Sequence, residues 1–169
     1  FDDSQLTMLR NLGKQRLVPT TGFLPSVSGV GAVCVADLDG DVLPDVFAAN
    51  RLQSSASGKP GTLLRNNLLS GFVDASASLP SMQVECESAA AGDVDNDGDV
   101  DILLANLAGS TILLENDGLG GFSSSTIPQS GSKIVQLVDL DLDGDLDALV
   151  ATHSPRQVHL LENTGFLTF

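Results

Sequence analysis

The chain has 169 residues, and its 22 acidic residues against 8 basic ones give a formal net charge of −14. This balance argues against nucleic acid and anionic membranes as partners, because both are bound by basic patches. No apolar run approaches the roughly 18–20 residues that span a bilayer, so we expect no membrane insertion.

The predicted elements are short strands. Gly, Asn and Asp interrupt the apolar segments about every eight to twelve residues, a spacing that is typical of strands and unfavourable for helices. Four strands recur in each repeat unit. The first strands are predicted at 31–36, 88–92 and 134–138, and the second strands at 45–50, 101–106 and 147–152. The third strands end in Leu-Leu-x-Asn at 63–66, 113–116 and 160–163. The fourth strands open on Gly-Phe at 71–72, 121–122 and 165–166.

Part of a further unit precedes these three. Residues 8–11 match the end of the third strands, and Leu24-Pro25 matches Leu79-Pro80. We therefore expect the chain to open in the middle of a unit. The predicted boundaries are 1–28 for the last two strands of one unit, 29–83 and 84–131 for two whole units, and 132–169 for a unit whose fourth strand begins at 166–169.

Many of the strands are apolar without strict alternation, which indicates that both of their faces are covered. In an antiparallel protein, the stacked blades of a β-propeller provide such cover. The units recur at intervals of 56 and 46 residues, in the range of propeller blades. The sequence thus predicts an all-β fold, a single β-propeller segment of about three and a half four-stranded antiparallel blades.

Each unit carries a nine-residue acidic loop between its first and second strands, at 37–45, 93–101 and 139–147. The carboxylates at loop positions 1, 3, 5 and 9 repel one another unless a positive charge sits among them. A hard divalent cation that takes about six to eight oxygens, above all Ca²⁺, suits such a set. The predicted metal ligands are Asp37, Asp39, Asp41 and Asp45, then Asp93, Asp95, Asp97 and Asp101, then Asp139, Asp141, Asp143 and Asp147, with Leu43, Asp99 and Asp145 at position 7 offering backbone carbonyls.

We expect two or three bound Ca²⁺ and give more weight to the second and third loops. Position 6 is Gly98 and Gly144 in those loops but Val42 in the first, where a positive φ is costly for a β-branched residue. We expect Gly40, two positions earlier, to relocate the turn of the first loop. An EF-hand is excluded, because its Glu at position 12 is replaced by an apolar residue in all three loops and the flanks are not helical.

From Met8 onward, the repeat resembles the FG-GAP repeat, also called the VCBS type, of integrin α-subunit N-terminal propellers and of many secreted proteins. The acidic loop between two strands and the later Gly-Phe pair carry this resemblance. It implies a propeller of seven, sometimes six, blades with Ca²⁺ in the loop that joins the first two strands of a blade. It also implies an extracellular or cell-surface location and a role in adhesion and recognition, in some members beside an attached enzyme.

Two classes of function remain. The favoured one is a non-enzymatic module for adhesion, protein interaction or extracellular structure, whose loops Ca²⁺ stabilises and which binds a protein partner or the remaining blades of a longer chain or assembly. The alternative is a carbohydrate-binding propeller or the accessory domain of a polysaccharide-active enzyme, and it ranks second because the chain has no Trp or Tyr. We expect no catalysis, because nucleophile and phosphate-binding motifs are absent from the sequence and carboxylates that hold Ca²⁺ are not free for acid–base chemistry.

Three further groups of residues have structural interpretations. Cys34 and Cys86 are predicted to be separate buried thiols, because neighbouring strands would place them at different heights. The asparagines at the ends of second and third strands are interpreted as turn formers. Phe72, Phe122 and Phe166 are interpreted as wedges that pack one blade on the next.

Overall fold

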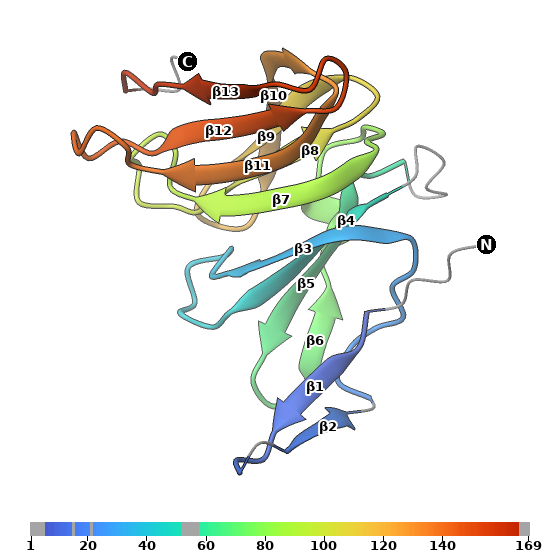
Figure 1. Ribbon diagram of the computed structural model, residues 1–169. Coiled ribbons are helices and arrows are strands. Elements are labelled where there is room, and N and C mark those ends of the chain that lie inside the picture. Colours follow the sequence, from blue (N-terminus) through green and yellow to red (C-terminus); the bar gives the residue numbers. More distant parts are fainter. Residues whose placement is uncertain (1–5, 15, 21, 52–57, 166–169) are drawn as a thin grey trace.

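The structure is a computed structural model of the chain, and it describes residues 6–14, 16–20, 22–51 and 58–165. In these ranges the chain forms four antiparallel sheets and one short 3-10 helix, η1 (Ser76–Ser78) (Figure 1). None of the described residues forms a helix with the length and apolarity that crossing a membrane requires.

Three of the sheets follow one another as successive units of the chain. The first contains β3 (Val30–Ala36), β4 (Asp45–Asn50), β5 (Gly61–Asn67) and β6 (Gly71–Asp74). The second contains β7 (Cys86–Gly92), β8 (Asp101–Asn106), β9 (Ser110–Asn116) and β10 (Phe122–Ser130). The third contains β11 (Ser132–Val138), β12 (Asp147–Thr152) and β13 (Val158–Leu161).

Each of these sheets is an antiparallel meander, in which strands that are consecutive in the sequence are neighbours. The first and second strands pair as far as the ends of the acidic loop, where Ala36 faces Asp45, Gly92 faces Asp101 and Val138 faces Asp147. The register also shifts once near the start of each first strand. A bulge at the same place in all three sheets fixes the same register in each.

The core lies between the sheets. Ile102 and Leu104 of β8 belong to a buried cluster that they share with the first sheet, including Phe47. Leu103 and Ala105 of the same strand belong to a second buried cluster, which they share with the third sheet. Both faces of β8 are therefore covered, which explains its apolar sequence without alternation. Burial of each such large side chain contributes roughly 1.5–3 kcal/mol.

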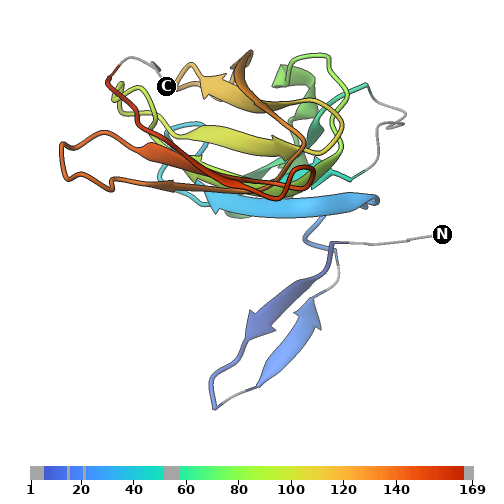
Figure 2. The same cartoon turned by 45° about the horizontal axis from the view of Figure 1, so that its top comes forward.

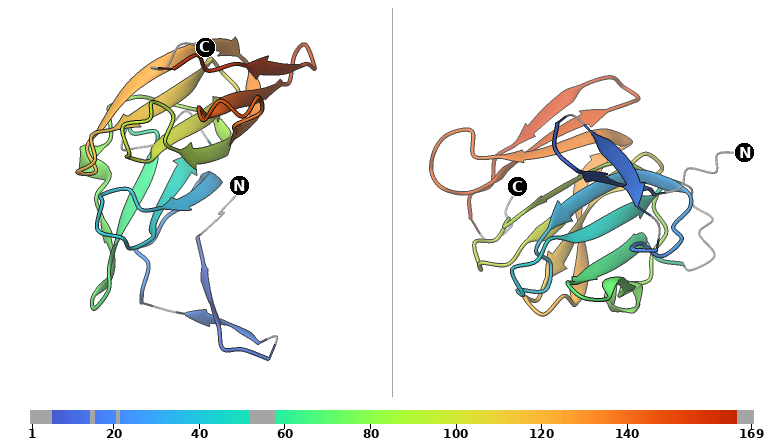
Figure 3. Two further views of the ribbon diagram at one scale, coloured as in Figure 1. Left: turned by 90° about the vertical axis from the view of Figure 1, so that its left-hand side faces the viewer. Right: turned by 90° about the horizontal axis from the view of Figure 1, so that it is seen from below.

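A two-stranded hairpin, β1 (Met8–Asn11) with β2 (Leu17–Thr20), precedes the first sheet. It projects away from the three stacked sheets, as the turned view shows (Figure 2). The left view of Figure 3 shows the same arrangement. The segment that follows the hairpin joins the first sheet through a hydrogen bond of 2.9 Å from the Phe72 N–H to the Phe23 carbonyl. Leu9 and Leu17 of the hairpin remain largely exposed.

The predicted fold class is confirmed: the chain is an all-β propeller segment of antiparallel sheets. The second strands have the bounds that the sequence predicts, while the first strands begin one or two residues earlier than predicted. The third strand of the last unit ends at Leu161, short of the predicted Asn163. The fourth strand expected at 166–169 lies outside the described residues. The division into units at 28, 83 and 131 stays a prediction.

Cys34 and Cys86 are buried free thiols, as the sequence predicts. They belong to the same core cluster, between the first and second sheets. Burial raises the pKa of each thiol to about 12, which keeps both protonated and unreactive at neutral pH.

Candidate metal sites

The three acidic loops lie on the same side of the stacked sheets, on the left of Figure 1. Each loop connects the first strand of its sheet to the second, so the shared meander places all three at equivalent positions. The loops are 37–45, between β3 and β4, 93–101, between β7 and β8, and 139–147, between β11 and β12.

The first Asp of each loop folds the loop back on itself. Asp37 accepts hydrogen bonds from the N–H groups of Gly40 and Val42, at 2.9 and 2.7 Å. Asp93 accepts one from Gly98 at 3.0 Å, and Asp139 one from Gly144 at 3.2 Å. Such side chain–backbone bonds are a general reason for Asp in tight turns. These hydrogen bonds therefore hold the loop in its conformation without a bound cation.

The ninth Asp of each loop is a buried clamp. Asp45, Asp101 and Asp147 are all buried within the strands that they begin. One oxygen of each accepts the N–H of loop position 2, at 3.0 Å in all three loops. The other accepts the N–H of the Asn that follows the Leu-Leu-x motif of the third strand, at 2.8, 2.9 and 2.9 Å. These residues therefore hold the fold together, a role that the sequence analysis missed.

Each loop also brings three carboxylate oxygens within 4.8 Å of one another. The groups are Asp37, Asp39 and Asp45, then Asp93, Asp95 and Asp101, then Asp139, Asp141 and Asp143. The third group therefore takes its third oxygen from loop position 5, where the other two use position 9. All nine residues are among the predicted metal ligands.

Two buried oxygens of these groups have an environment that suits a bound cation. Among the described residues, Asp39 Oδ1 and Asp93 Oδ1 are buried without a hydrogen-bond partner. A buried carboxylate oxygen without a donor is costly, and a cation would remove that cost. The electrostatics agree, because burial raises the pKa of Asp101 to about 6. Neighbouring carboxylates add to this rise, and two backbone hydrogen bonds oppose it. Burial likewise raises the pKa of Asp45 and of Asp95.

The other predicted ligands lie in the same loops but outside these groups. They are Asp41, Leu43, Asp97, Asp99, Asp145 and Asp147. Asp41 and Asp97 accept the N–H of loop position 7, at 2.8 and 2.9 Å. Asp145 accepts a hydrogen bond from the Asn96 side chain of the neighbouring loop. Their part in holding a metal stays a prediction.

The backbone of the first loop corrects one expectation. All three loops have positive φ at positions 4 and 6, with values of 76, 60 and 65° at position 4 and 70, 97 and 102° at position 6. Gly40 therefore does not relocate the turn, and the prediction that it would is wrong. Val42 adopts the left-handed conformation itself, because the hydrogen bonds to Asp37 impose it. Such a conformation costs of order 1–3 kcal/mol at a non-Gly residue.

One asparagine connects each of the first two acidic loops to the sheet that follows it. The Asn116 side-chain amide donates to the carbonyl of Leu38 in the first loop, at 3.3 Å. The Asn163 amide donates to the carbonyl of Val94 in the second loop, at 2.7 Å. The sequence analysis interpreted these residues only as turn formers. Their recurrence after Leu-Leu-x was the available signal, but their partners lie 78 and 69 residues away in the chain.

Stacked antiparallel sheets with an acidic loop at the same edge of each define a β-propeller repeat protein. A family model described as an FG-GAP-like repeat matches the chain twice, at residues 37–104 and 93–150. Each match begins at the first Asp of an acidic loop, and together the matches cover more than half of the chain. The chain therefore belongs to the FG-GAP-like repeat family. No curated protein matches it.

Proposed function

We propose that the chain is an extracellular β-propeller module for adhesion or protein interaction, and that Ca²⁺ stabilises its acidic loops. The observation that carries the proposal is the recurrence of three Asp oxygens within 4.8 Å in every loop, with buried unpartnered oxygens at Asp39 and Asp93. Family membership supports it, because FG-GAP-like repeats form propellers and often bind Ca²⁺. The acidic composition is also consistent with an ion that offsets charge inside each loop.

The residues that would hold an ion are those of the three Asp groups. Ca²⁺ takes about six to eight oxygens, so the carbonyl at position 7 and water would complete each set, with the position-5 Asp added in the first two loops. The bound ion would supply positive charge at the point where the carboxylates converge. Each loop joins two strands of one sheet, so the ion would tighten a turn and act structurally. We propose no catalytic role, because carboxylates that hold an ion are not free for proton transfer.

A calcium titration tests this proposal. We expect isothermal titration calorimetry of the purified chain to find two ions of similar affinity and a third, weaker one. Asp95→Ala and Asp141→Ala should each remove one ion, because each deletes one oxygen of a three-Asp group. Asp74→Ala is the matched control, since it deletes an exposed carboxylate at the end of β6, outside the loops. Unchanged stoichiometry in both Asp variants would contradict the loop assignment.

The proposed interaction surface is the outer face of the third sheet, the face opposite the second sheet. The residue at position 2 of each acidic loop shows that this face is exposed. Leu38 and Val94 are covered by the next sheet and are 0% and 1% exposed, while Leu140 is 46% exposed. Leu160 of β13 is 55% exposed, whereas its repeat equivalents, Leu63 and Leu113, are buried. This face therefore presents the same apolar positions that the first two sheets bury against a neighbour.

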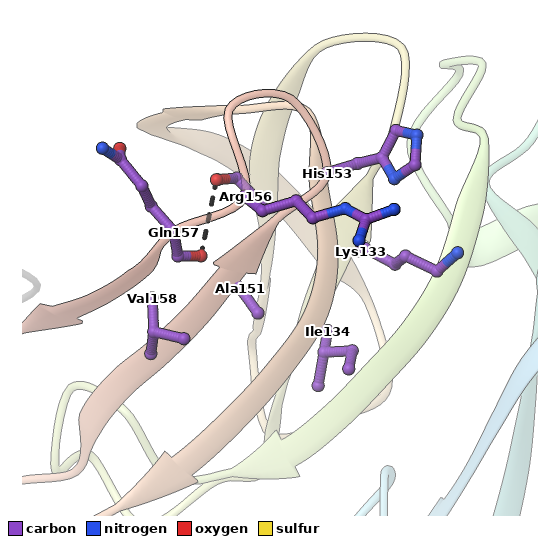
Figure 4. A pocket seen from close by; sticks show the side chains of 8 residues that line it. Lys133, Ile134, Ala151, His153, Arg156, Gln157 and Val158 are labelled. Carbon is purple, nitrogen blue, oxygen red and sulfur yellow. Dashed lines mark hydrogen bonds between the residues drawn. The ribbon is translucent and has the colours of Figure 1, made fainter.

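A pocket on this face corresponds to a site that a strand fills elsewhere in the structure. Ile134, Ala151 and Val158 line it, with Lys133, His153 and Arg156 around them (Figure 4). The repeat equivalent of Ile134 in the second sheet is Ser88. The Ser88 hydroxyl accepts the N–H of Val135 in β11 at 3.2 Å, so the first strand of the following sheet occupies that position.

The occupant that fits is a further FG-GAP-type blade, in the purified chain a second copy. Asn66 of the first sheet is the repeat equivalent of Asn116 and Asn163, so a second copy would offer its amide to the Leu140 carbonyl. We expect the chain to self-associate in sedimentation velocity experiments, and Leu160→Asp to shift it toward the monomer. Leu69→Asp, in an exposed turn, is the control and should leave association unchanged. A wild-type chain that remains monomeric would contradict this interface.

The carbohydrate-binding alternative stays second. Sugar-binding faces rely on Trp and Tyr, and the sequence has neither residue. Binding to a glycan array that Leu160→Asp does not affect would favour the alternative over the blade interface.

A further inference from the structure

Arg65 places a positive charge inside the acidic cluster of the first loop. It lies in β5, directly before Asn66, and its Nε is 3.3 Å from Asp39 Oδ2. The contact is an ion pair without hydrogen-bond alignment, because Arg65 Nε has no hydrogen-bond partner among the described residues. Asp39 is one of the three carboxylates that converge in this loop. The first loop therefore has a cation of its own beside one of its expected metal ligands.

The other two loops have no such cation at this position of the repeat. The residue directly before the third-strand Asn is Glu115 in the second unit and Glu162 in the third. A carboxylate there adds negative charge near an acidic loop, whereas Arg65 subtracts it. The three loops therefore share their ligands but differ in the charge that the third strand brings to them.

The second sheet is shaped to receive Arg65. Its Nη2 donates a hydrogen bond of 3.0 Å to the Leu119 carbonyl, in the turn between β9 and β10. A Cβ on Gly120 would lie 1.9 Å from Arg65 Nη2, so a side chain at position 120 would displace the guanidinium from this place. In the same turn, hydrogen bonds from the N–H groups of Gly121 and Leu119, together with the charge of Arg65, lower the pKa of Asp117.

We propose that Arg65 is the built-in counter-ion of the first loop, which makes the loop at 37–45 a weaker Ca²⁺ site than the loops at 93–101 and 139–147. Arg65 links this loop to the second sheet, because it pairs with Asp39 and donates a hydrogen bond to the Leu119 carbonyl. A Ca²⁺ ion that enters the loop meets the positive charge of Arg65 beside Asp39. Asp39 Oδ1 remains buried and unpartnered, so the loop keeps an oxygen for an ion but binds it against the guanidinium. This inference rests on the proposed calcium-binding function.

Arg65→Gln tests the inference by removing the charge while keeping much of the side chain. In calorimetric titrations with CaCl₂, we expect the weakest site to bind at least about ten-fold more tightly in the variant, and the other two sites to change less than about two-fold. Arg65→Glu, which introduces the residue of the other two units, should raise the affinity of the same site at least as much. It also serves if Arg65→Gln folds poorly.

Lys133→Gln is the matched control. It removes the same charge from another ion pair, in which Lys133 Nζ lies 3.1 Å from Glu87, away from the acidic loops. An equal gain in Lys133→Gln would show a general effect of net charge and overturn the inference. Three unchanged sites in both Arg65 variants would also overturn it, although calcium binding itself would then stand. Absence of binding in every variant would instead contradict the proposed function.

Discussion

Calcium at 10 mM should raise the melting midpoint of the chain by about 5–20 °C over the value in EDTA. In EDTA, each loop holds converging carboxylates that repel one another, and Ca²⁺ stabilises only the folded arrangement. Extracellular modules bind Ca²⁺ with dissociation constants on the order of 10⁻⁴–10⁻³ M. Calcium at 10 mM is about 10 to 100 times these constants and adds about 1.4–2.7 kcal/mol per site. For a chain of this size, 1 kcal/mol shifts the midpoint by roughly 2–4 °C, and two occupied sites give the stated range.

Differential scanning calorimetry measures this shift. Mg²⁺ at the same concentration is the control, because it demands octahedral geometry, keeps its water and should stabilise the loops less. Equal midpoints in EDTA and in calcium would contradict the proposed function.

The calcium-dependent shift should also grow between pH 4.5 and pH 7. In the absence of Ca²⁺, the pKa of Asp101 is about 6 in the folded chain, above the roughly 3.9 of an unfolded Asp. The folded state then binds more protons than the unfolded state in this window, so its stability falls as the pH rises. Ca²⁺ binds the ionised carboxylates and reverses that loss. A shift that is larger at pH 4.5 than at pH 7 would contradict this account.

The strands that flank the acidic loops could be predicted well because their signals are local. The second strands begin at Asp45, Asp101 and Asp147, which end the loop motif, and their predicted bounds agree with the structure. The starts of the first strands were less predictable, since each begins before a bulge that only pairing with the second strand reveals. In the last unit, the Leu-Leu-x-Asn motif predicted a strand to Asn163, but β13 ends at Leu161.

The candidate sites were predictable as clusters but not as a system of contacts. The Asp repeat placed nine carboxylates that the structure groups in threes. The roles of Asn116, Asn163 and Arg65 depend on contacts between sheets, and a single repeat carries no information on what the next one presents. Val42 shows that a local signal can also mislead. Its side chain disfavours a positive φ, yet the hydrogen bonds to Asp37 impose that φ.

Asp101→Ala should destabilise the chain by about 3–5 kcal/mol even in EDTA. The Asp101 side chain accepts the N–H of Val94 at 3.0 Å and the N–H of Asn116 at 2.9 Å, and its residue is only 1% exposed. Its removal leaves two buried N–H groups without acceptors, and hydrogen bonds to charged groups contribute about 1.5–3 kcal/mol each. Asn116 would also lose its alignment with the Leu38 carbonyl, so the damage should extend to the packing of the first sheet on the second.

Asp97→Ala is the control that separates this clamp from the metal site. Asp97 lies in the same loop but is exposed, and it accepts the Asp99 N–H within the loop. In EDTA it should cost less than about 1 kcal/mol in the free energy of unfolding measured by urea denaturation. In 10 mM calcium its cost should rise if it completes the ligand set, whereas the cost of Asp101→Ala should be large under both conditions. If Asp101→Ala cost as little as Asp97→Ala in EDTA, Asp101 would act only through the ion. A clamp made of hydrogen bonds to backbone N–H groups, by contrast, holds the sheet whether or not an ion is bound.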